Sequence, residues 1–122
     1  MLKKSSPFVK ISYFDEKAVW KALKLFLAEL EGKHPEVEKV LIFGSFIKGQ
    51  CVPGSDVDLL LILTESAVPL LERIPRYMPS AFPVSVDVFP YTKAEVAGML
   101  REGNPFIKRA LEEGKVITGG DF

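Results

Sequence analysis

Two short apolar runs with polar residues at their facing ends constrain this chain most. The run VLIF at residues 40–43 ends at Gly44 and Ser45, and the run LLLIL at residues 59–63 follows an Asp-Val-Asp triplet at residues 56–58. Continuous apolar runs of this length, bounded by turn residues, are typical of buried strands. For Gly44 to lie beside Asp56, the two strands should run antiparallel. The pattern therefore predicts a polar site where these strand ends meet.

The rest of the pattern predicts helices and a third strand around these two. Apolar residues at helical spacing indicate a helix from Asp15 to Gly32, and a third strand is expected at residues 83–89, where apolar and polar residues alternate. A short helix or turn is expected at residues 44–50. A helix broken by prolines should start at residues 64–66, and two more follow at residues 92–102 and 105–113. This order indicates an α/β or α+β fold.

Length and charge limit the functions to consider. The chain has 122 residues, enough for one domain, with 16 basic and 16 acidic residues and the single cysteine Cys51. Balanced charge gives no general positive field for a long polyanion, so nucleic acid is an unlikely ligand. No run is apolar enough to cross a membrane, and the first residues lack the apolar core of a signal peptide. We expect a cytoplasmic protein.

The Asp-Val-Asp triplet is a candidate metal site. Strand residues two apart point the same way, so Asp56 and Asp58 should project from one face while Val57 and the leucines beyond it line the other. Two neighbouring carboxylates repel each other, and a cation that prefers hard oxygen ligands turns that repulsion into coordination. Magnesium has this preference and is commonly completed by substrate phosphates. The triplet therefore predicts a magnesium site for a phosphorylated substrate.

Gly44 and Ser45 are candidates for a phosphate cradle. A glycine lets the backbone approach a ligand closely, and exposed amides after a strand can donate hydrogen bonds to phosphate oxygens. The Ser45 hydroxyl can add another hydrogen bond. Lys48 is either a cation that neutralises phosphate charge or a solvated surface lysine. A triphosphate held here would present its inner phosphate to the metal on Asp56 and Asp58.

Asp87 is the third candidate ligand. It is the sole acid in the predicted strand at residues 83–89, where a buried charge is costly unless it is paired or bound to metal. If that strand lies next to the second strand, three carboxylates converge and could hold two ions. One ion would bind the triphosphate and the other the attacking hydroxyl. The chemistry expected is in-line attack on phosphorus.

Each feature also has a simpler structural interpretation. An Asp-Val-Asp triplet alone is usually a strand edge with solvated acids. Tyr91 is either a border of the nucleotide pocket or a packed aromatic at a strand end. Arg101, Lys108 and Arg109 fit the solvated faces of the last helices. The joint occurrence of the glycine-serine pair and the three acids at predicted strand ends favours an active site.

The motifs GSFIKG at residues 44–49, GSDVDL at 54–59 and VDV at 86–88 resemble those of the DNA polymerase beta-like nucleotidyltransferase superfamily. They are most similar to its small stand-alone branch, the minimal nucleotidyltransferases. The resemblance covers about residues 15–118 of a single expected domain at residues 1–122. It implies a nucleotidyltransferase fold of the α/β (α+β) class, with a small mixed sheet flanked by helices.

The resemblance also implies a reaction. A nucleoside monophosphate, AMP if the donor is ATP, would be attached to an acceptor hydroxyl with release of pyrophosphate. Two magnesium ions would lie on the catalytic carboxylates, which are Asp56, Asp58 and Asp87. The triphosphate would be held by residues near the strand ends, which are Gly44, Ser45, Lys48 and Ser55. Lys48 departs from the family pattern, in which an arginine is expected, and so keeps the charge but not the bidentate fork.

The acceptor and the partner are less defined. Members of this branch commonly pair with a small helical HEPN protein, and some act as antitoxins by adenylylating it. Relatives that modify antibiotics or RNA carry an extra domain for the acceptor, so we expect a partner chain or a shallow cleft to supply it here. A homodimer or a hetero-complex would also cover exposed apolar surface.

Three hypotheses follow for the function. The first is an enzyme that transfers AMP to a hydroxyl of a HEPN-type partner, in the manner of an antitoxin. The second is a non-catalytic antitoxin or regulatory subunit that binds nucleotide or only its partner. The third is a structural cation site in an ordinary α/β domain.

Overall fold

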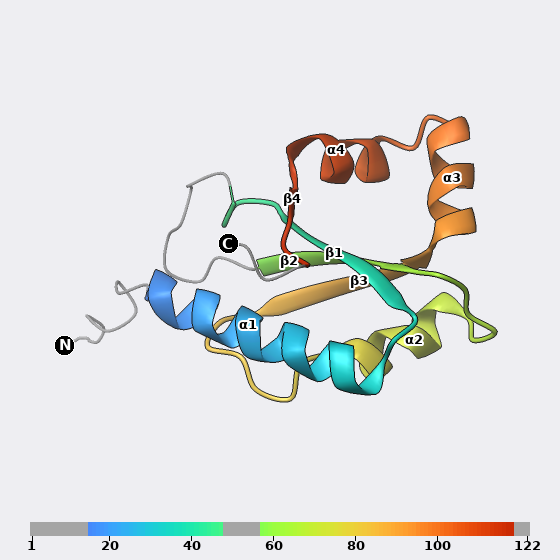
Figure 1. Cartoon of the computed structure of the whole chain (residues 1–122). Coiled ribbons are helices and arrows are strands. Elements are labelled where there is room, and N and C mark those ends of the chain that lie inside the picture. Colours follow the sequence, from blue (N-terminus) through green and yellow to red (C-terminus); the bar gives the residue numbers. More distant parts are fainter. Residues whose placement is uncertain (1–14, 48–56, 119–122) are drawn as a thin grey trace.

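A computed structural model describes residues 15–47 and 57–118 (Figure 1). The elements follow in the order α1 (Glu16–Lys33), β1 (Val37–Phe43), β2 (Val57–Leu63), α2 (Leu70–Tyr77), β3 (Val86–Thr92), α3 (Lys93–Arg101), α4 (Pro105–Glu113) and β4 (Lys115–Val116). The strands form one sheet in the order β3-β2-β1-β4. β1 is antiparallel to β2 and β4, whereas β2 and β3 are parallel. The expected mixed sheet and the antiparallel pairing of the first two strands are confirmed.

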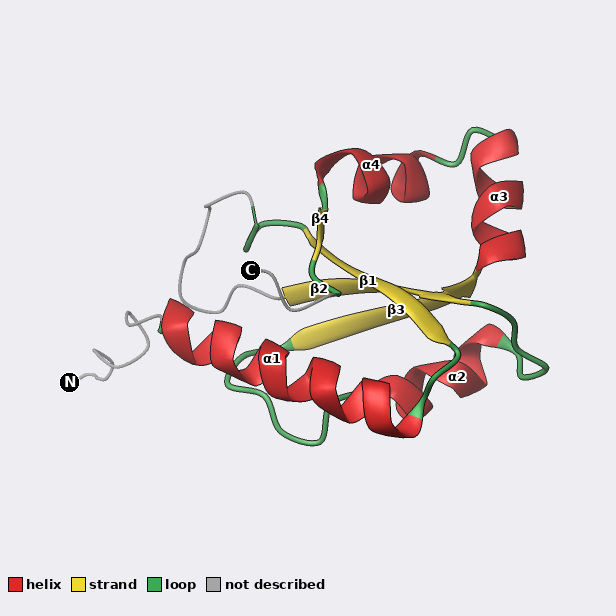
Figure 2. Cartoon of the chain, viewed as in Figure 1, coloured by secondary structure: helices red, strands yellow, loops and turns green. Residues whose placement is uncertain are grey.

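Helices cover both faces of this sheet. Figure 2 shows α1 and α2 on one side and α3 and α4 on the other. Beneath α1, a buried apolar cluster joins that helix to the odd-numbered residues of β2. Beneath α3 and α4, a second cluster is built around Leu41, Leu60, Val96, Ile107 and Ala110. The sheet is therefore a middle layer, and its central strand β2 is buried on both sides, which explains its continuous apolar sequence.

The alternation of β2 assigns each side chain to a face. Val57, Leu59, Leu61 and Leu63 are buried in the cluster under α1. Leu60 points to the opposite face, where it packs in the second cluster. Asp58 lies two residues before Leu60 in the strand and therefore points to the same face as Leu60. Asp58 lies at the start of the strand and is only half-buried. The predicted separation of Asp58 from Val57, Leu59, Leu61 and Leu63 is thus confirmed.

Two predicted elements after β2 are displaced along the chain. No helix begins at residues 64–66; instead the Ser66 hydroxyl oxygen accepts a hydrogen bond from the Val68 N–H at 3.1 Å, a local turn, and α2 begins at Leu70. The third strand was expected at residues 83–89 and is observed as Val86–Thr92. Pro90 lies inside it, which is tolerated because β3 is at an edge of the sheet.

Capping residues mark the starts of α3 and α4. Thr92 and Glu95 form a capping box at the start of α3, and Asn104 is the N-cap of α4, directly before Pro105; the helices expected there are confirmed. α1 continues one residue past Gly32, to Lys33. The two-residue strand β4 was not expected, because a pair of exposed residues carries no periodic pattern.

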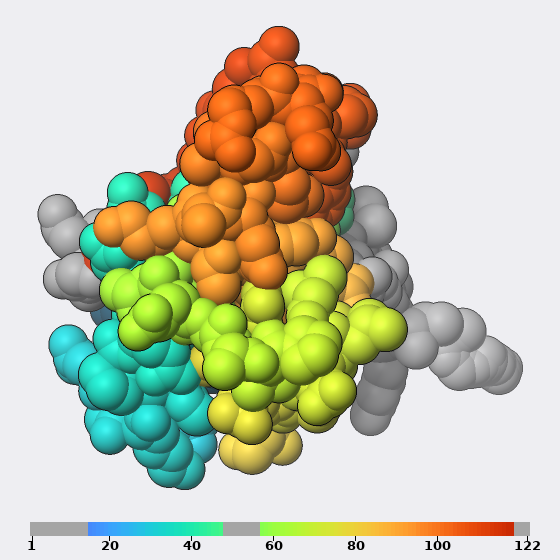
Figure 3. All heavy atoms as spheres, turned by 90° about the vertical axis from the view of Figure 1, so that its right-hand side faces the viewer, coloured from blue at the N-terminus to red at the C-terminus, as the bar shows by residue number. Residues whose placement is uncertain are grey.

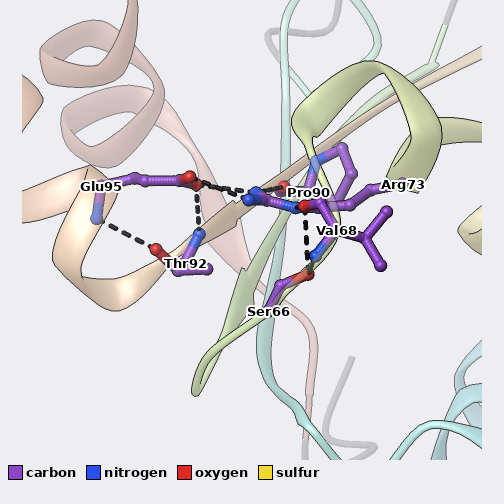
Figure 4. Close-up of polar contacts among 6 residues, drawn as sticks. All are labelled: Ser66, Val68, Arg73, Pro90, Thr92 and Glu95. Carbon is purple, nitrogen blue, oxygen red and sulfur yellow. Dashed lines mark hydrogen bonds and ion pairs between the residues drawn. The ribbon is translucent and has the colours of Figure 1, made fainter.

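A buried arginine joins α2 to β3 and α3 (Figure 4). Arg73 donates hydrogen bonds to the Val68 carbonyl (2.6 Å) and to the Pro90 carbonyl (2.9 Å). It also donates to both carboxylate oxygens of Glu95, at 2.7 and 2.9 Å. Glu95 in turn accepts from the Thr92 backbone N–H. The bidentate pair satisfies a guanidinium that would otherwise be buried without a counter-charge.

This pair should make stability depend on acid pH. The hydrogen bonds from Arg73 lower the pKa of Glu95 to about 2, from an ordinary value of 4.5. Because the pKa is lowered on folding, the stabilisation is present above pH 4.5 and is lost as the pH falls toward 2. We expect Glu95→Gln to lower the free energy of unfolding at pH 7 by about 1–3 kcal/mol, with the difference vanishing near pH 2.

Urea unfolding at pH 7, 5, 3 and 2 measures this effect. Glu112→Gln is the matched control, because Glu112 is an exposed glutamate on α4. It should change neither the stability nor its pH dependence. A Glu95→Gln protein as stable as the wild type at pH 7 would contradict the assigned role of the pair.

Within the described residues, no helix is long and apolar enough to cross a membrane.

Candidate active site

The end of β1 and the start of β2 meet at Gly44 and Asp58. Phe43 pairs with Asp58 across the antiparallel ladder, so Gly44 follows directly beside that carboxylate. Gly44 has φ +89°, in the left-handed region that favours glycine. A Cβ built on it would collide with Asp58 Oδ2 and lie 3.3 Å from Asp58 Cγ. The absence of a side chain at residue 44 therefore lets the backbone and the carboxylate share this space.

Asp87 lies next to Asp58 in the sheet. The two residues are partners in the parallel ladder between β2 and β3. Aligned residues of neighbouring strands point to the same face, and their strands lie roughly 4.8 Å apart. The register between β2 and β3 could not be predicted from the sequence. It brings Asp58 and Asp87, two of the three predicted carboxylates, together.

Asp87 is exposed, and in this respect the prediction was wrong. The sequence suggested a buried charge in an apolar strand, but Asp87 is the second residue of the edge strand β3 and faces solvent. Its charge is therefore stabilised by water and needs no buried partner. An exposed acid beside the half-buried Asp58 leaves one side of the site open to a second molecule.

Several predicted site residues lie outside the described ranges 15–47 and 57–118. These are Lys48, Ser55 and Asp56. Asp56 precedes Asp58 by two positions in the sequence, and its role stays a prediction.

A pocket of about 230 Å³ opens beside Gly44. Gly44 and Ser45 form one wall, and α4 forms the other. The described lining residues are Phe43, Gly44, Ser45, Phe106, Arg109, Ala110 and Glu113. The predicted phosphate cradle therefore borders a real cavity, and α4 supplies residues to it that the sequence did not single out.

Close packing holds α4 against the end of β1. The helix ends at Gly114, where a Cβ would meet the Ala110 carbonyl and lie 3.2 Å from the Ile42 carbonyl oxygen. Three aromatic rings fill the space between sheet and helix. Their centroids are 5.8 Å apart for Phe43 and Phe89, 5.7 Å for Phe43 and Phe106, and 5.0 Å for Phe89 and Phe106. This cluster fixes where the polar residues of α4 stand relative to Gly44 and Ser45.

Arg109 lines this pocket, and sequence reasoning did not place it there. It was interpreted as part of a solvated helix face, and it is indeed exposed. Yet it lies three residues after Phe106, which packs on Phe43 and thereby turns this helix face toward the pocket. The spacing of Phe106, Arg109, Ala110 and Glu113 was a usable signal, but only once the partner surface of the helix was known.

A larger pocket of about 320 Å³ lies away from the carboxylates. Its described lining residues come from α2, β3, α3 and the C-cap of α3 and are Leu70, Tyr91, Glu95, Gly98, Met99 and Glu102. Figure 3 shows this side of the molecule, with α3 above the first part of α2. Tyr91 therefore lines a different pocket from Gly44 and Ser45, and it packs with the cluster under α3 and α4. Asp58, Asp87 and the glycine-serine pair do not line this pocket, so it is not the candidate active site.

Residues 23–118 match the sequence model of a protein family, the nucleotidyltransferase domain. The chain belongs to the nucleotidyltransferase domain family. The matched range contains β1, Gly44 and Ser45, β2, Asp87 and α4, so every part of the candidate site lies within the nucleotidyltransferase domain. A comparison with curated proteins gives no match.

Two solved structures share the nucleotidyltransferase fold. One is a candidate nucleotidyltransferase from Sulfolobus solfataricus, with 24% identity and a TM-score of 0.52, covering 66% of this chain and 72% of that one. The other is a toxin-antitoxin with AMP-PNP, with 19% identity and a TM-score of 0.52, covering 83% of this chain and 73% of that one. At these identities the likeness shows the fold.

The contact between Gly44 and Asp58 can be tested by stability. Gly44→Ala should cost roughly 1–2 kcal/mol for the left-handed backbone, and roughly 1 kcal/mol more because the carboxylate must move. Gly103→Ala is the matched control, since Gly103 has φ +72° and open space around its would-be Cβ. Its cost should be the backbone part alone.

A double-mutant cycle isolates the contact. In an Asp58→Ala background, Gly44→Ala should cost no more than Gly103→Ala, because the colliding carboxylate is gone. The free energies of unfolding come from urea titration. Equal losses for Gly44→Ala and Gly103→Ala in the wild-type background would show that Asp58 does not occupy this position.

Proposed function

We propose that this chain is a magnesium-dependent nucleotidyltransferase that transfers AMP from ATP to a hydroxyl group of a partner protein. The observation that carries the proposal is the register of Asp58 with Asp87 on one face of the sheet, with Gly44 against Asp58. Membership of the nucleotidyltransferase domain family supports the reaction class. The donor, the metal and the acceptor are parts of the proposal.

The donor atoms present suit magnesium. Two carboxylates in ladder register offer hard oxygen ligands to one small cation, and Asp56 is the proposed third carboxylate. The proposed sites for two ions are thus Asp56, Asp58 and Asp87. When bound, magnesium would neutralise phosphate charge and lower the pKa of the attacking hydroxyl.

The protein groups would act on the phosphates and on the acceptor. Backbone amides at Gly44 and Ser45, with the Ser45 hydroxyl, would donate hydrogen bonds to phosphate oxygens, and Lys48 and Ser55 are further candidates. The acceptor oxygen forms a bond to the α-phosphorus while the bond to the bridging oxygen breaks and pyrophosphate leaves. We assign the proton of the acceptor hydroxyl to Asp87, since this carboxylate faces the open side of the site.

The proposed acceptor is a partner chain of the HEPN type. The open side at Asp87 gives a second protein access to the carboxylates, as protein acceptors require. A structural neighbour that is a toxin-antitoxin with AMP-PNP supports an antitoxin-like role. In this role, adenylylation would neutralise the partner.

Removing a carboxylate should abolish transfer without unfolding the protein. We expect Asp58→Asn and Asp87→Asn each to lower the rate of transfer by more than about 100-fold, since each loses a charged metal ligand at the reacting phosphate. Glu112→Gln, which removes an exposed charge from α4, should leave the rate unchanged. The chain is co-purified with its cellular partner, and the complex is incubated with each of the four triphosphates and magnesium.

Mass spectrometry of the intact partner protein shows whether a nucleotide has been transferred to it. A gain of one nucleotide identifies donor and acceptor together. The non-catalytic alternative predicts that Asp58→Asn still neutralises the partner in cells and that no mass is gained. That pair of results would overturn the catalytic proposal.

A further inference from the structure

We infer that Arg109 binds the outer phosphates of the triphosphate, those that leave as pyrophosphate, and thereby acts as a second phosphate-binding element on α4. The inference rests on the proposed function and adds that the α4 wall of the site binds the outer phosphates of the substrate. It concerns the pocket whose described lining residues are Gly44, Ser45 and neighbours on β1 and the α4 face.

The position of the pocket orders the phosphates. Gly44 lies against the Asp58 carboxylate and also lines the pocket. A triphosphate whose inner phosphate lies at Asp58 and Asp87 must therefore extend past Gly44, either into this pocket or away from the glycine-serine amides. Only the first path keeps the outer phosphates on those amides. On that path they reach the wall formed by α4.

The charges of the site single out Arg109. The acidic neighbours Asp58, Asp87 and Glu113 would repel a polyanion, and the whole chain carries no net charge that could offset them. Among the described residues lining the pocket, Arg109 is the one cation. An anionic ligand in this pocket thus has one described side chain to balance its charge.

Arg109 is also free to bind a ligand. Within residues 15–47 and 57–118 its side chain makes no hydrogen bond or ion pair. Its guanidinium offers a planar fork that matches two phosphate oxygens, which a point charge such as a lysine cannot do. The aromatic contact of Phe106 with Phe43 holds the helix that carries it. Because charge builds on the leaving phosphates during transfer, such a contact would strengthen in the transition state.

Comparison of ATP with AMP tests the inference, because AMP lacks the outer phosphates. Binding is measured by calorimetry with magnesium for the wild type, Arg109→Gln, Arg109→Lys and the control Lys108→Gln. Lys108 is an exposed cation on the same helix and does not line the pocket. Thermal unfolding of each variant near the wild-type temperature confirms that the fold is retained.

The expected result is selective. Arg109→Gln should weaken ATP binding by about 10- to 100-fold and AMP binding by less than about twofold. The loss of ATP affinity in Arg109→Lys should lie between that of Arg109→Gln and no loss. Lys108→Gln should change ATP binding by less than about twofold. Inorganic tripolyphosphate should follow the same order as ATP.

Two results would overturn the inference in distinguishable ways. If the wild type binds ATP and Arg109→Gln binds it equally well, or loses ATP and AMP to the same extent, Arg109 does not contact the outer phosphates and the proposed function stands. If the wild type binds no triphosphate with magnesium, the proposed function and this inference fail together.

Discussion

The close approach of Gly44 to Asp58 is the constraint on which the site depends. Antiparallel pairing of β1 with β2 brings the end of one strand to the start of the other, and a side chain at residue 44 would occupy the place of the Asp58 carboxylate. The parallel pairing of β2 with β3 then adds Asp87 on the same face. Because β2 packs against apolar clusters on both faces, a one-residue slip would exchange those faces and carry the Asp58 carboxylate toward the apolar cluster under α1. The core thus sets the position of the acids.

Much of this arrangement could be predicted from the sequence, because the signals are local. Apolar runs, a capping box and an Asn-Pro helix start are properties of neighbouring residues, and the corresponding elements were confirmed. The glycine-serine pair and Asp58 also followed from their places at strand ends. The predicted boundaries of α2 and β3 were wrong, and both lie near prolines, which are compatible with more than one local structure. Pro69 is the N-cap of α2, and Pro90 lies inside the edge strand β3.

What the sequence could not supply depends on contacts between distant residues. The exposure of Asp87 follows from the edge position of β3, which is a property of the sheet order. Arg73 and Glu95 are 22 positions apart, and only the packing of α2 against β3 makes their pairing evident. Arg109 carries no motif of its own, and it enters the site because the Phe106 contact turns its helix face toward Gly44 and Ser45.

The dependence of ATP binding on magnesium tests the central claim most directly. Calorimetry of the wild type with ATP, in magnesium and again in EDTA, is compared with the same pair of titrations on Asp58→Asn. If the carboxylates hold the metal that binds the triphosphate, magnesium should tighten ATP binding to the wild type by at least about tenfold and have little effect on the variant. Equal binding with and without magnesium, or an undiminished magnesium effect in Asp58→Asn, would contradict the account.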